Sequence, residues 1–135
     1  MISTKSKYAL KAMIDIAVHK NSEEYISIKE IAKREDISLK YLEQVISLLI
    51  KGRLLISVRG SNGGYRLVKK PEEYTALEII TATDGDITRN LYDDGSTKKF
   101  FEAFAGCLST YLSNVTLEDL VNDYHEVNKV FDYSI

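Results

Sequence analysis

The sequence predicts a mainly α-helical protein with one small β-hairpin, arranged as a winged helix-turn-helix followed by a long C-terminal dimerisation helix. Residues 27–51 repeat apolar side chains at helical spacing, with one break at 36–38. Residues 54–68 hold two short apolar runs on either side of the turn sequence SNGG. Residues 97–114 carry another apolar stripe at helical spacing. The order helix, turn, helix, hairpin defines the winged unit.

The first helix is predicted over residues 3–20. Ser3 or Thr4 can cap its start, and apolar side chains recur every three or four positions, at Tyr8, Ala9, Ala12, Met13, Ile16 and Ala17. His19 closes the helix, where an imidazolium is mildly favourable against the helix dipole. We expect a structural role for His19, because no other metal ligand stands at a suitable spacing beside it.

The helix-turn-helix begins at Ser27, whose hydroxyl can accept from a free backbone N–H of the first turn. Glu30, three residues later, completes a capping box. Asp36 interrupts the helix, because aspartate tolerates the left-handed conformation that a tight turn needs. Ser38 can then cap a second helix, which ends at Gly52.

This second helix, residues 38–51, is predicted to enter a DNA groove. Its buried stripe consists of Leu42, Val45, Ile46 and Leu49, and a separate face carries Lys40, Gln44, Ser47 and Lys51. Cations mixed with short polar groups suit base edges and phosphates in a major groove. The candidate DNA-binding residues on this helix are Ser38, Lys40, Tyr41, Glu43, Gln44 and Ser47.

Two of these candidates have a second interpretation. Glu43 either accepts a hydrogen bond from a cytosine amine or pairs with Lys40 or Lys51 on the helix surface. Tyr41 either faces DNA or packs in the core with its hydroxyl on a polar partner, and we favour packing.

A β-hairpin follows, with strands predicted at 54–58 and 65–68. It carries cations before, after and below its tip: Arg59, Arg66, Lys69 and Lys70. A basic two-stranded wing fits a phosphate backbone or a minor groove. Within the wing, residues 57–67, the candidate DNA-binding residues are Arg59, Gly60, Ser61, Asn62 and Gly63.

Beyond Pro71, which stops the second strand, Thr75 and Glu78 predict a capped helix over 76–83 with core candidates Leu77, Ile79 and Ile80. Residues 86–96 are predicted to be a loop.

In the helix of 97–114 the apolar side is formed by Phe100, Phe104, Cys107, Leu108, Tyr111 and Leu112. Such a stripe outside the winged unit needs a partner surface, which is either a second copy of the chain or the chain's own body. A last helix begins at Thr116, which forms a capping pair with Asp119.

Composition supports a protein of the reducing cytoplasm. The chain has a single cysteine, so it forms no internal disulfide, and no run of 18 apolar residues predicts a membrane span. Charge is divided unevenly: residues 1–70 hold 14 Lys and Arg against 7 Asp and Glu, whereas residues 71–135 hold 4 against 13. A net +7 on the first half beside −9 on the second points to an acidic partner for the first half.

Four segments resemble the Rrf2 family of bacterial winged-helix regulators: STKSKYALKAMIDIA (3–17), ISLKYLEQ (37–44), SVRGSNGGYRL (57–67) and VTLEDLV (115–121). The resemblance implies a DNA-binding domain over 1–85, and a dimerisation part over 86–135 whose long helix pairs with its twin. In one branch of the family three closely spaced cysteines near 86–96 bind an iron–sulfur cluster. This chain has none there, so we expect no cofactor and no metal.

We therefore expect a homodimeric, sequence-specific regulator of transcription, a repressor, whose partners are double-stranded DNA and a second copy of itself. The signal is a small metabolite, a partner enzyme or oxidation of Cys107, and the sequence does not rank them. The alternative is a regulatory module that docks a partner protein and has little affinity for DNA. A catalytic role is not expected, because the sequence has no nucleophile elbow, phosphate-binding loop or His–Glu metal motif.

Overall fold

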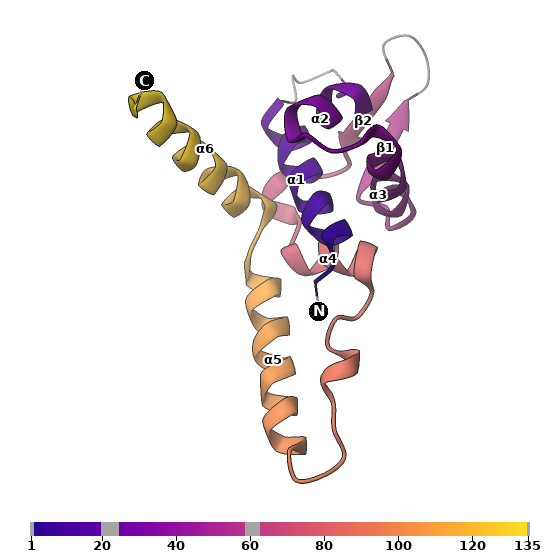
Figure 1. Cartoon of the computed structure of the whole chain (residues 1–135), viewed down its shortest axis with the longest axis vertical. Coiled ribbons are helices and arrows are strands. Elements are labelled where there is room, and N and C mark those ends of the chain that lie inside the picture. Colours follow the sequence, from indigo (N-terminus) through magenta and orange to yellow (C-terminus); the bar gives the residue numbers. More distant parts are fainter. Residues whose placement is uncertain (1, 20–24, 59–62, 135) are drawn as a thin grey trace.

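The computed structural model describes residues 2–19, 25–58 and 63–134. The described chain is mainly helical with a single two-stranded antiparallel sheet, which confirms the predicted fold class (Figure 1). In chain order the elements are α1 (Thr4–His19), α2 (Ile28–Glu35), α3 (Leu39–Lys51), β1 (Leu55–Val58), β2 (Gly64–Leu67), η1 (Pro71–Glu73), α4 (Ala76–Asp84), η2 (Arg89–Leu91), α5 (Lys98–Asn114) and α6 (Leu117–Ser134).

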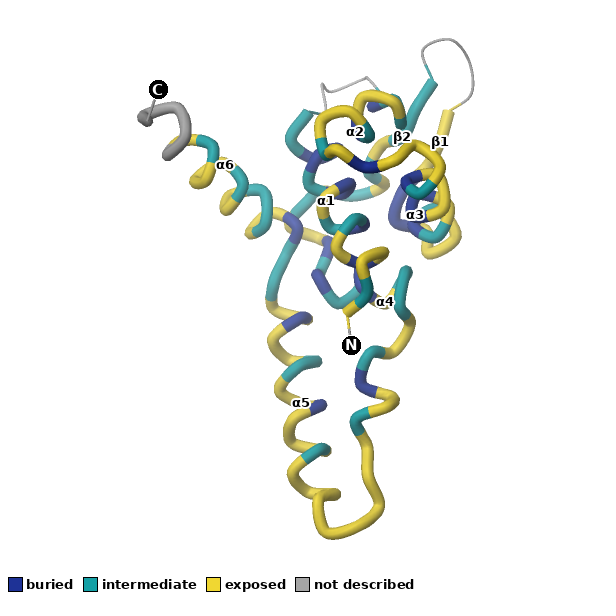
Figure 2. The backbone as a smooth tube through the Cα atoms, viewed as in Figure 1, coloured by how far each residue is buried: buried dark blue, intermediate teal, exposed yellow. Residues whose placement is uncertain are grey.

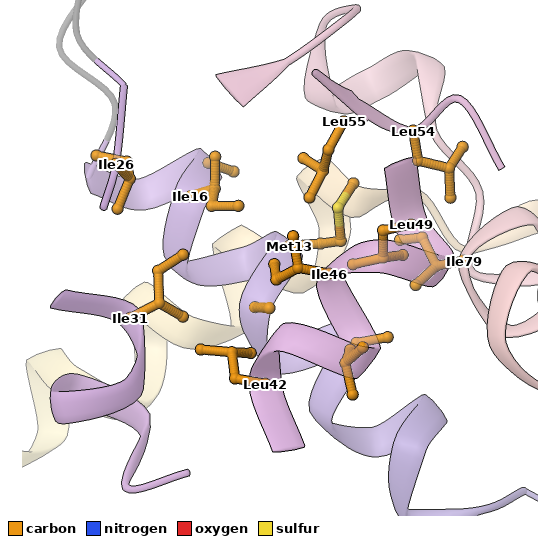
Figure 3. Packing of buried hydrophobic residues seen from close by; sticks show 14 of the residues in the cluster. Met13, Ile16, Ile26, Ile31, Leu42, Ile46, Leu49, Leu54, Leu55 and Ile79 are labelled. Atoms are coloured by element: carbon orange, nitrogen blue, oxygen red, sulfur yellow. The ribbon is translucent and has the colours of Figure 1, made fainter. Parts of the chain in front are cut away.

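The core forms around α1, which α2, α3, α4 and the start of α6 surround. Ala9, Ala12, Met13 and Ile16 of α1 are fully buried. Figure 3 shows Met13 and Ile16 among Leu42, Ile46 and Leu49 of α3. The small side chains of Ala9 and Ala12 let neighbouring helices approach closely, so the core is closed on several sides of α1 at once.

Local signals set the starts of three helices as predicted. Ser27 Oγ accepts from the Glu30 amide at 3.2 Å, and Thr75 Oγ1 accepts from the Glu78 amide at 3.1 Å. Among the described residues, the carboxylate of Glu30 does not return a bond to the Ser27 amide, so the predicted capping box is only half formed. At α6, Thr116 and Asp119 exchange both bonds of a capping box. The carboxylate of Glu78 departs from its predicted capping role, because it pairs with Lys69 instead, at 2.9 Å between Nζ and Oε2.

The hairpin is tied to the core through Tyr74, which is fully buried. Its hydroxyl donates to the Leu54 carbonyl at 2.7 Å and accepts from the Val68 amide at 2.8 Å. Leu54 precedes β1 and Val68 follows β2, so a single phenol joins both ends of the hairpin. The sequence analysis did not identify this role of Tyr74.

The second half of the chain extends away from the core. In Figure 1, α5 and the segment 85–97 form an arm that points away from α2 and the hairpin. Residues 86–96, predicted as a loop, include the 3-10 turn η2 and a buried Thr88. The last helix is longer than the capped start alone indicated, because α6 continues to Ser134.

Candidate nucleic-acid interface

The helix-turn-helix is closed by a backbone turn in the left-handed region. Asp36 has φ 53° and ψ 50°, and the Ile37 amide donates to the Ala32 carbonyl at 3.0 Å. Ser38 Oγ then accepts from the Tyr41 amide at 3.2 Å and starts α3. These contacts fix the angle between α2 and α3, as the break at 36–38 predicted.

On α3 the apolar and polar faces separate as expected. Leu42, Val45, Ile46 and Leu49 are buried, at 0–1% exposure. The opposite side, drawn in yellow in Figure 2, presents exposed polar residues: Ser38, Lys40, Glu43, Gln44, Ser47 and Lys51. Because the buried stripe fixes the rotation of the helix, these polar side chains are held outward as one surface. We call Lys40, Glu43, Gln44 and Ser47 the α3 polar face.

Tyr41 packs against the body of the protein. Its ring meets the ring of Tyr8 edge to face, with centroids 5.3 Å apart, and the side chain is half-buried. Lys11 Nζ lies 5.8 Å from the centroid of the Tyr8 ring. Tyr41 therefore lies in the seam between α1 and α3, which agrees with the packing interpretation.

An ion pair between a buried aspartate of α1 and an exposed arginine of α2 supports the helix-turn-helix. Asp15 of α1 is 1% exposed and receives two bonds from Arg34 of α2: Nε to Oδ2 at 2.9 Å and Nη2 to Oδ1 at 2.6 Å. This bidentate hydrogen bond raises the pKa of Arg34 above its already high value. His19 Nδ1 lies 3.0 Å from the Asp15 carbonyl and 3.7 Å from its carboxylate.

Sequence reasoning missed this pair. The statement that no carboxylate stands at a suitable spacing beside His19 was wrong, since Asp15 lies four residues before it on the same helix face. The signal available in the sequence was an aspartate within the mainly apolar middle of α1, because a carboxylate buried there needs a charged partner.

Glu35, which follows Arg34 in the sequence, is a third charged residue beside this pair. Burial, followed by the hydrogen bond and charge of Asp15, raises the pKa of Glu35 to about 7.

The described part of the wing joins a third segment of chain. Tyr65 and Ile26 exchange two backbone hydrogen bonds of 2.9 Å, and β1 pairs with β2 from Leu55–Leu67 to Val58–Gly64. Of the predicted wing contacts, Gly63 is half-buried. The predicted contacts Arg59, Gly60, Ser61 and Asn62 lie outside the described residues.

The cations at the base of the wing differ in their surroundings. Arg66 is exposed and lies over the Tyr25 ring, 5.4 Å from its centroid. Lys70 is also exposed. Lys69, predicted as one of the cations of the wing, pairs with Glu78 and lies 4.9 Å from the centroid of the Tyr74 ring. Its charge is thus partly neutralised inside the chain.

The predicted dimerisation stripe of α5 divides into two faces. Phe100 and Tyr111 are 63% and 66% exposed, Phe104 and Cys107 are exposed, and Leu108 is half-buried. Leu112, predicted on the same stripe, is 8% exposed and packs on Ala76 and Ile80 of α4. It lies about 100° around the helix from Tyr111, one residue away, and therefore turns toward the chain's own body. We call Phe100, Phe104, Cys107 and Tyr111 the α5 outer face.

Comparisons with known proteins agree on one family. The sequence model of the Rrf2 family, described as an iron-dependent transcriptional regulator, matches residues 2–123. The chain is 37% identical to the HTH-type transcriptional regulator IscR of Serratia proteamaculans, over 90% of this chain and 79% of the relative. Its fold is similar to that of CymR, the global cysteine regulator of B. subtilis, with TM-score 0.81, 36% identity and coverage of 90% and 96%. A solved IscR from T. potens gives TM-score 0.79 at 36% identity, with coverage of 94% and 90%.

The donor set of this chain does not fit an iron–sulfur cluster held by one subunit. Such clusters are bound mainly by several cysteine thiolates, whereas this sequence has one, Cys107, exposed on α5. Across residues 2–19, 25–58 and 63–134, no three His, Cys, Asp or Glu side chains gather in a way that could hold a metal ion. In the same ranges, no helix is long and apolar enough to cross a membrane.

Proposed function

Because the chain belongs to the Rrf2 family of transcriptional regulators, we propose that it acts as a homodimeric repressor that reads a two-fold symmetric operator with α3. DNA binding and regulation of transcription follow from the family, and its relatives are regulators rather than enzymes. The proposal adds the dimer, the direction of regulation and the contact residues. It also places the protein in the bacterial cytoplasm, where its DNA target lies.

The observation that carries the proposal is the α3 polar face. Four polar side chains stand on one exposed surface of a helix whose other side is fully buried. Lys40 and Gln44 can donate to phosphates or to the N7 and O6 edges of bases. The hydroxyl of Ser47 can likewise contact phosphates or base edges. Glu43 is exposed and in no ion pair within the described part of the chain, which leaves it free to accept from a cytosine amine. The wing residues 57–67 would then contact the backbone beside the groove.

The α5 outer face supports the dimer. Three exposed aromatic side chains on one helix form an apolar surface that water solvates poorly. Pairing this face with its own copy about a two-fold axis would bury the aromatics and place two α3 helices in successive major grooves. Their separation would be one turn of DNA, about 34–36 Å.

Binding to DNA fragments of the chain's own promoter tests the contact residues. We expect Lys40→Ala and Gln44→Ala to weaken binding several-fold. Lys40→Ala should also lower the slope of log affinity against log salt by about 0.9 if it contacts one phosphate. Lys99→Ala, which removes an exposed cation from α5, is the matched control and should change neither quantity. Equal effects of Lys40→Ala and Lys99→Ala would contradict the assignment.

Sedimentation of the purified protein tests the dimer. Phe104→Ser should shift the monomer–dimer equilibrium toward monomer by at least tenfold, because it removes an aromatic from the centre of the proposed interface. Val68→Ser alters a comparably exposed apolar residue beside the wing and should leave the equilibrium unchanged. A wild-type protein that sediments as a monomer at micromolar concentration would refute the dimer.

A protein-docking module remains the second candidate, because the second half of the chain carries a net −9 beside the α5 outer face. Retention on a DNA column separates the two functions. A sequence-specific reader should prefer its operator to random duplex by at least about a thousandfold. In vitro transcription from the bound promoter then tests repression, which requires less transcript when the protein is added.

A further inference from the structure

A cavity of about 250 Å³ lies between α4, the segment that follows it and α5. Its apolar lining comes from Leu77, Ile87 and Leu112, and its polar lining from Thr81, Asp86, Thr88 and Ser109. Water occupies about 30 Å³ per molecule in the liquid, so this space suits an organic molecule of roughly five to eight non-hydrogen atoms.

The proposed dimer would leave the cavity open. Ser109 and Leu112 stand three residues apart on the side of α5 that turns toward α4. Phe104 and Tyr111, on the α5 outer face, lie about 80° to 160° around the helix from them. The cavity and the proposed dimer interface are therefore separate surfaces of one helix.

The charge of the residues that line the cavity favours a ligand of positive charge. Asp86 is the one charged residue among the described residues that line it, and its side chain is exposed at the mouth of the cavity. The hydrogen bonds from Thr88 and, more weakly, the charge of the nearby Arg89 lower the pKa of Asp86, although no Lys or Arg forms an ion pair with Asp86 in the described ranges. Asp86 Oδ1 accepts from the Thr88 amide at 2.9 Å and from its hydroxyl at 2.6 Å. These bonds orient the carboxylate and use one oxygen, so Oδ2 is available to a ligand.

Two further polar groups are available beside it. Thr81 and Ser109 also line the cavity, and the hydroxyl of neither takes part in a hydrogen bond within the described part of the chain. A primary ammonium group has three N–H donors, which matches one carboxylate and two hydroxyls. A short hydrocarbon chain matches the wall of Leu77, Ile87 and Leu112.

We propose that the cavity between α4 and α5 binds a small primary amine with a short aliphatic chain, its ammonium on Asp86 and its hydrocarbon against Leu77, Ile87 and Leu112. Because the cavity joins the last helix of the winged unit to the proposed dimerisation helix, a bound amine would fix the angle between them. This regulatory use rests on the proposed function, whereas binding itself does not.

The first experiment measures binding without DNA. n-Butylamine, titrated into the ¹⁵N-labelled full chain at pH 7, should shift the amide resonances of Thr81, Ile87 and Ser109 with a dissociation constant in the millimolar range or tighter. 1-Butanol should bind at least tenfold more weakly, and butyrate should not bind. Absent shifts with n-butylamine, or equal binding of all three molecules, would overturn the proposal.

A matched pair of variants locates the charge. Asp86→Asn keeps an oxygen that can accept from Thr88, so the segment should stay folded, and it should weaken n-butylamine binding at least tenfold. Asp93→Asn changes an aspartate of the same segment that accepts from Thr97 and does not line the cavity; it should bind n-butylamine like the wild type. Equal affinities for both variants would place the amine elsewhere.

Operator binding with and without n-butylamine then tests regulation. The wild type should change its operator affinity at least threefold on adding the amine, and Asp86→Asn should not respond. Amine binding that depends on Asp86, found in a protein with no operator affinity, would support the site and refute the proposed function. An operator affinity that does not change would refute the regulatory use alone.

Discussion

The carboxylate of Asp15 makes a charged contact between α1 and α2, the first helix of the helix-turn-helix. It accepts from two guanidinium nitrogens of Arg34. Glu35, which follows Arg34 in the sequence, interacts with the same carboxylate. Two carboxylates close to one guanidinium cannot both be neutralised by it. Burial, together with the hydrogen bond and charge of Asp15, disfavours the ionised form of Glu35, and this makes the end of α2 sensitive to protons.

Glu35→Gln should remove this sensitivity. The pKa of Glu35 is raised from its ordinary 4.5 to about 7 in the folded protein, so between these values the folded state binds more protons than the unfolded chain. Its contribution to stability is full below about pH 4.5 and is lost as pH rises through 7. Denaturant unfolding from pH 5 to 8.5 should show the variant gaining stability relative to the wild type as pH rises.

The control for this measurement is Glu30→Gln, an exposed glutamate on the same helix. Its difference from the wild type should not follow the pH trend of Glu35→Gln. A Glu35→Gln variant whose stability runs parallel to the wild type across the whole range would show that Glu35 is not the proton-linked group.

At the scale of elements, the wing depends on close backbone contact between β2 and the segment before α2. A Cβ built on Gly64 would lie 2.4 Å from the Ile26 carbonyl oxygen and 3.0 Å from the Ser27 amide nitrogen. Both atoms belong to the backbone, so they cannot move aside as a flexible side chain would. Only glycine lets Ile26 pair with Tyr65.

Gly64→Ala should therefore separate the Ile26 segment from β2 and lower the free energy of unfolding by about 1–3 kcal/mol. Its operator affinity should fall as well, because the base of the wing moves. Gly95→Ala serves as the control, since its added Cβ meets only the Asp93 carboxylate, at 3.6 Å, and surface changes of this kind stay within about 0.5 kcal/mol. Equal stabilities in urea would contradict the close approach.

At the scale of the whole molecule, the first helix and the start of the last helix are held in one core. Leu117 is fully buried in the same cluster as Met13 and Leu49. Its amide donates to the Tyr74 carbonyl at 3.1 Å, and the Ala76 amide donates to the Val115 carbonyl at 2.8 Å. The start of α6 thus returns to the winged unit after α5 has extended away from it (Figure 1).

Leu117→Ala tests this closure. Removing a fully buried leucine should cost about 2–5 kcal/mol, through lost burial and the cavity left behind, and the loss should appear in the unfolding of the entire chain. Val127→Ala, on the same helix but 56% exposed, should change stability by less than about 0.5 kcal/mol. Calorimetry that shows α6 melting separately, with the remaining transition unchanged, would contradict the shared core.

Much of the fold could be predicted from the sequence because it depends on interactions between residues a few positions apart. Ser27, Ser38, Thr75 and Thr116 each accept from the amide three residues later, and such capping is local. Helical periodicity placed the buried stripe of α3, and therefore its exposed polar face. The predicted bounds of the six helices lie within a few residues of the observed ones, except at the far end of α6.

Contacts between distant segments could be decided only by the tertiary structure. Asp15 binds Arg34, which is 19 residues away in the sequence, and Lys69 forms an ion pair with Glu78. Leu112 packs on α4 and does not belong to the α5 outer face. Each depends on the angle and rotation at which whole helices pack, and neither periodicity nor capping specifies these. The sequence thus determined which surfaces the helices could present, whereas packing decided which of those surfaces stayed exposed.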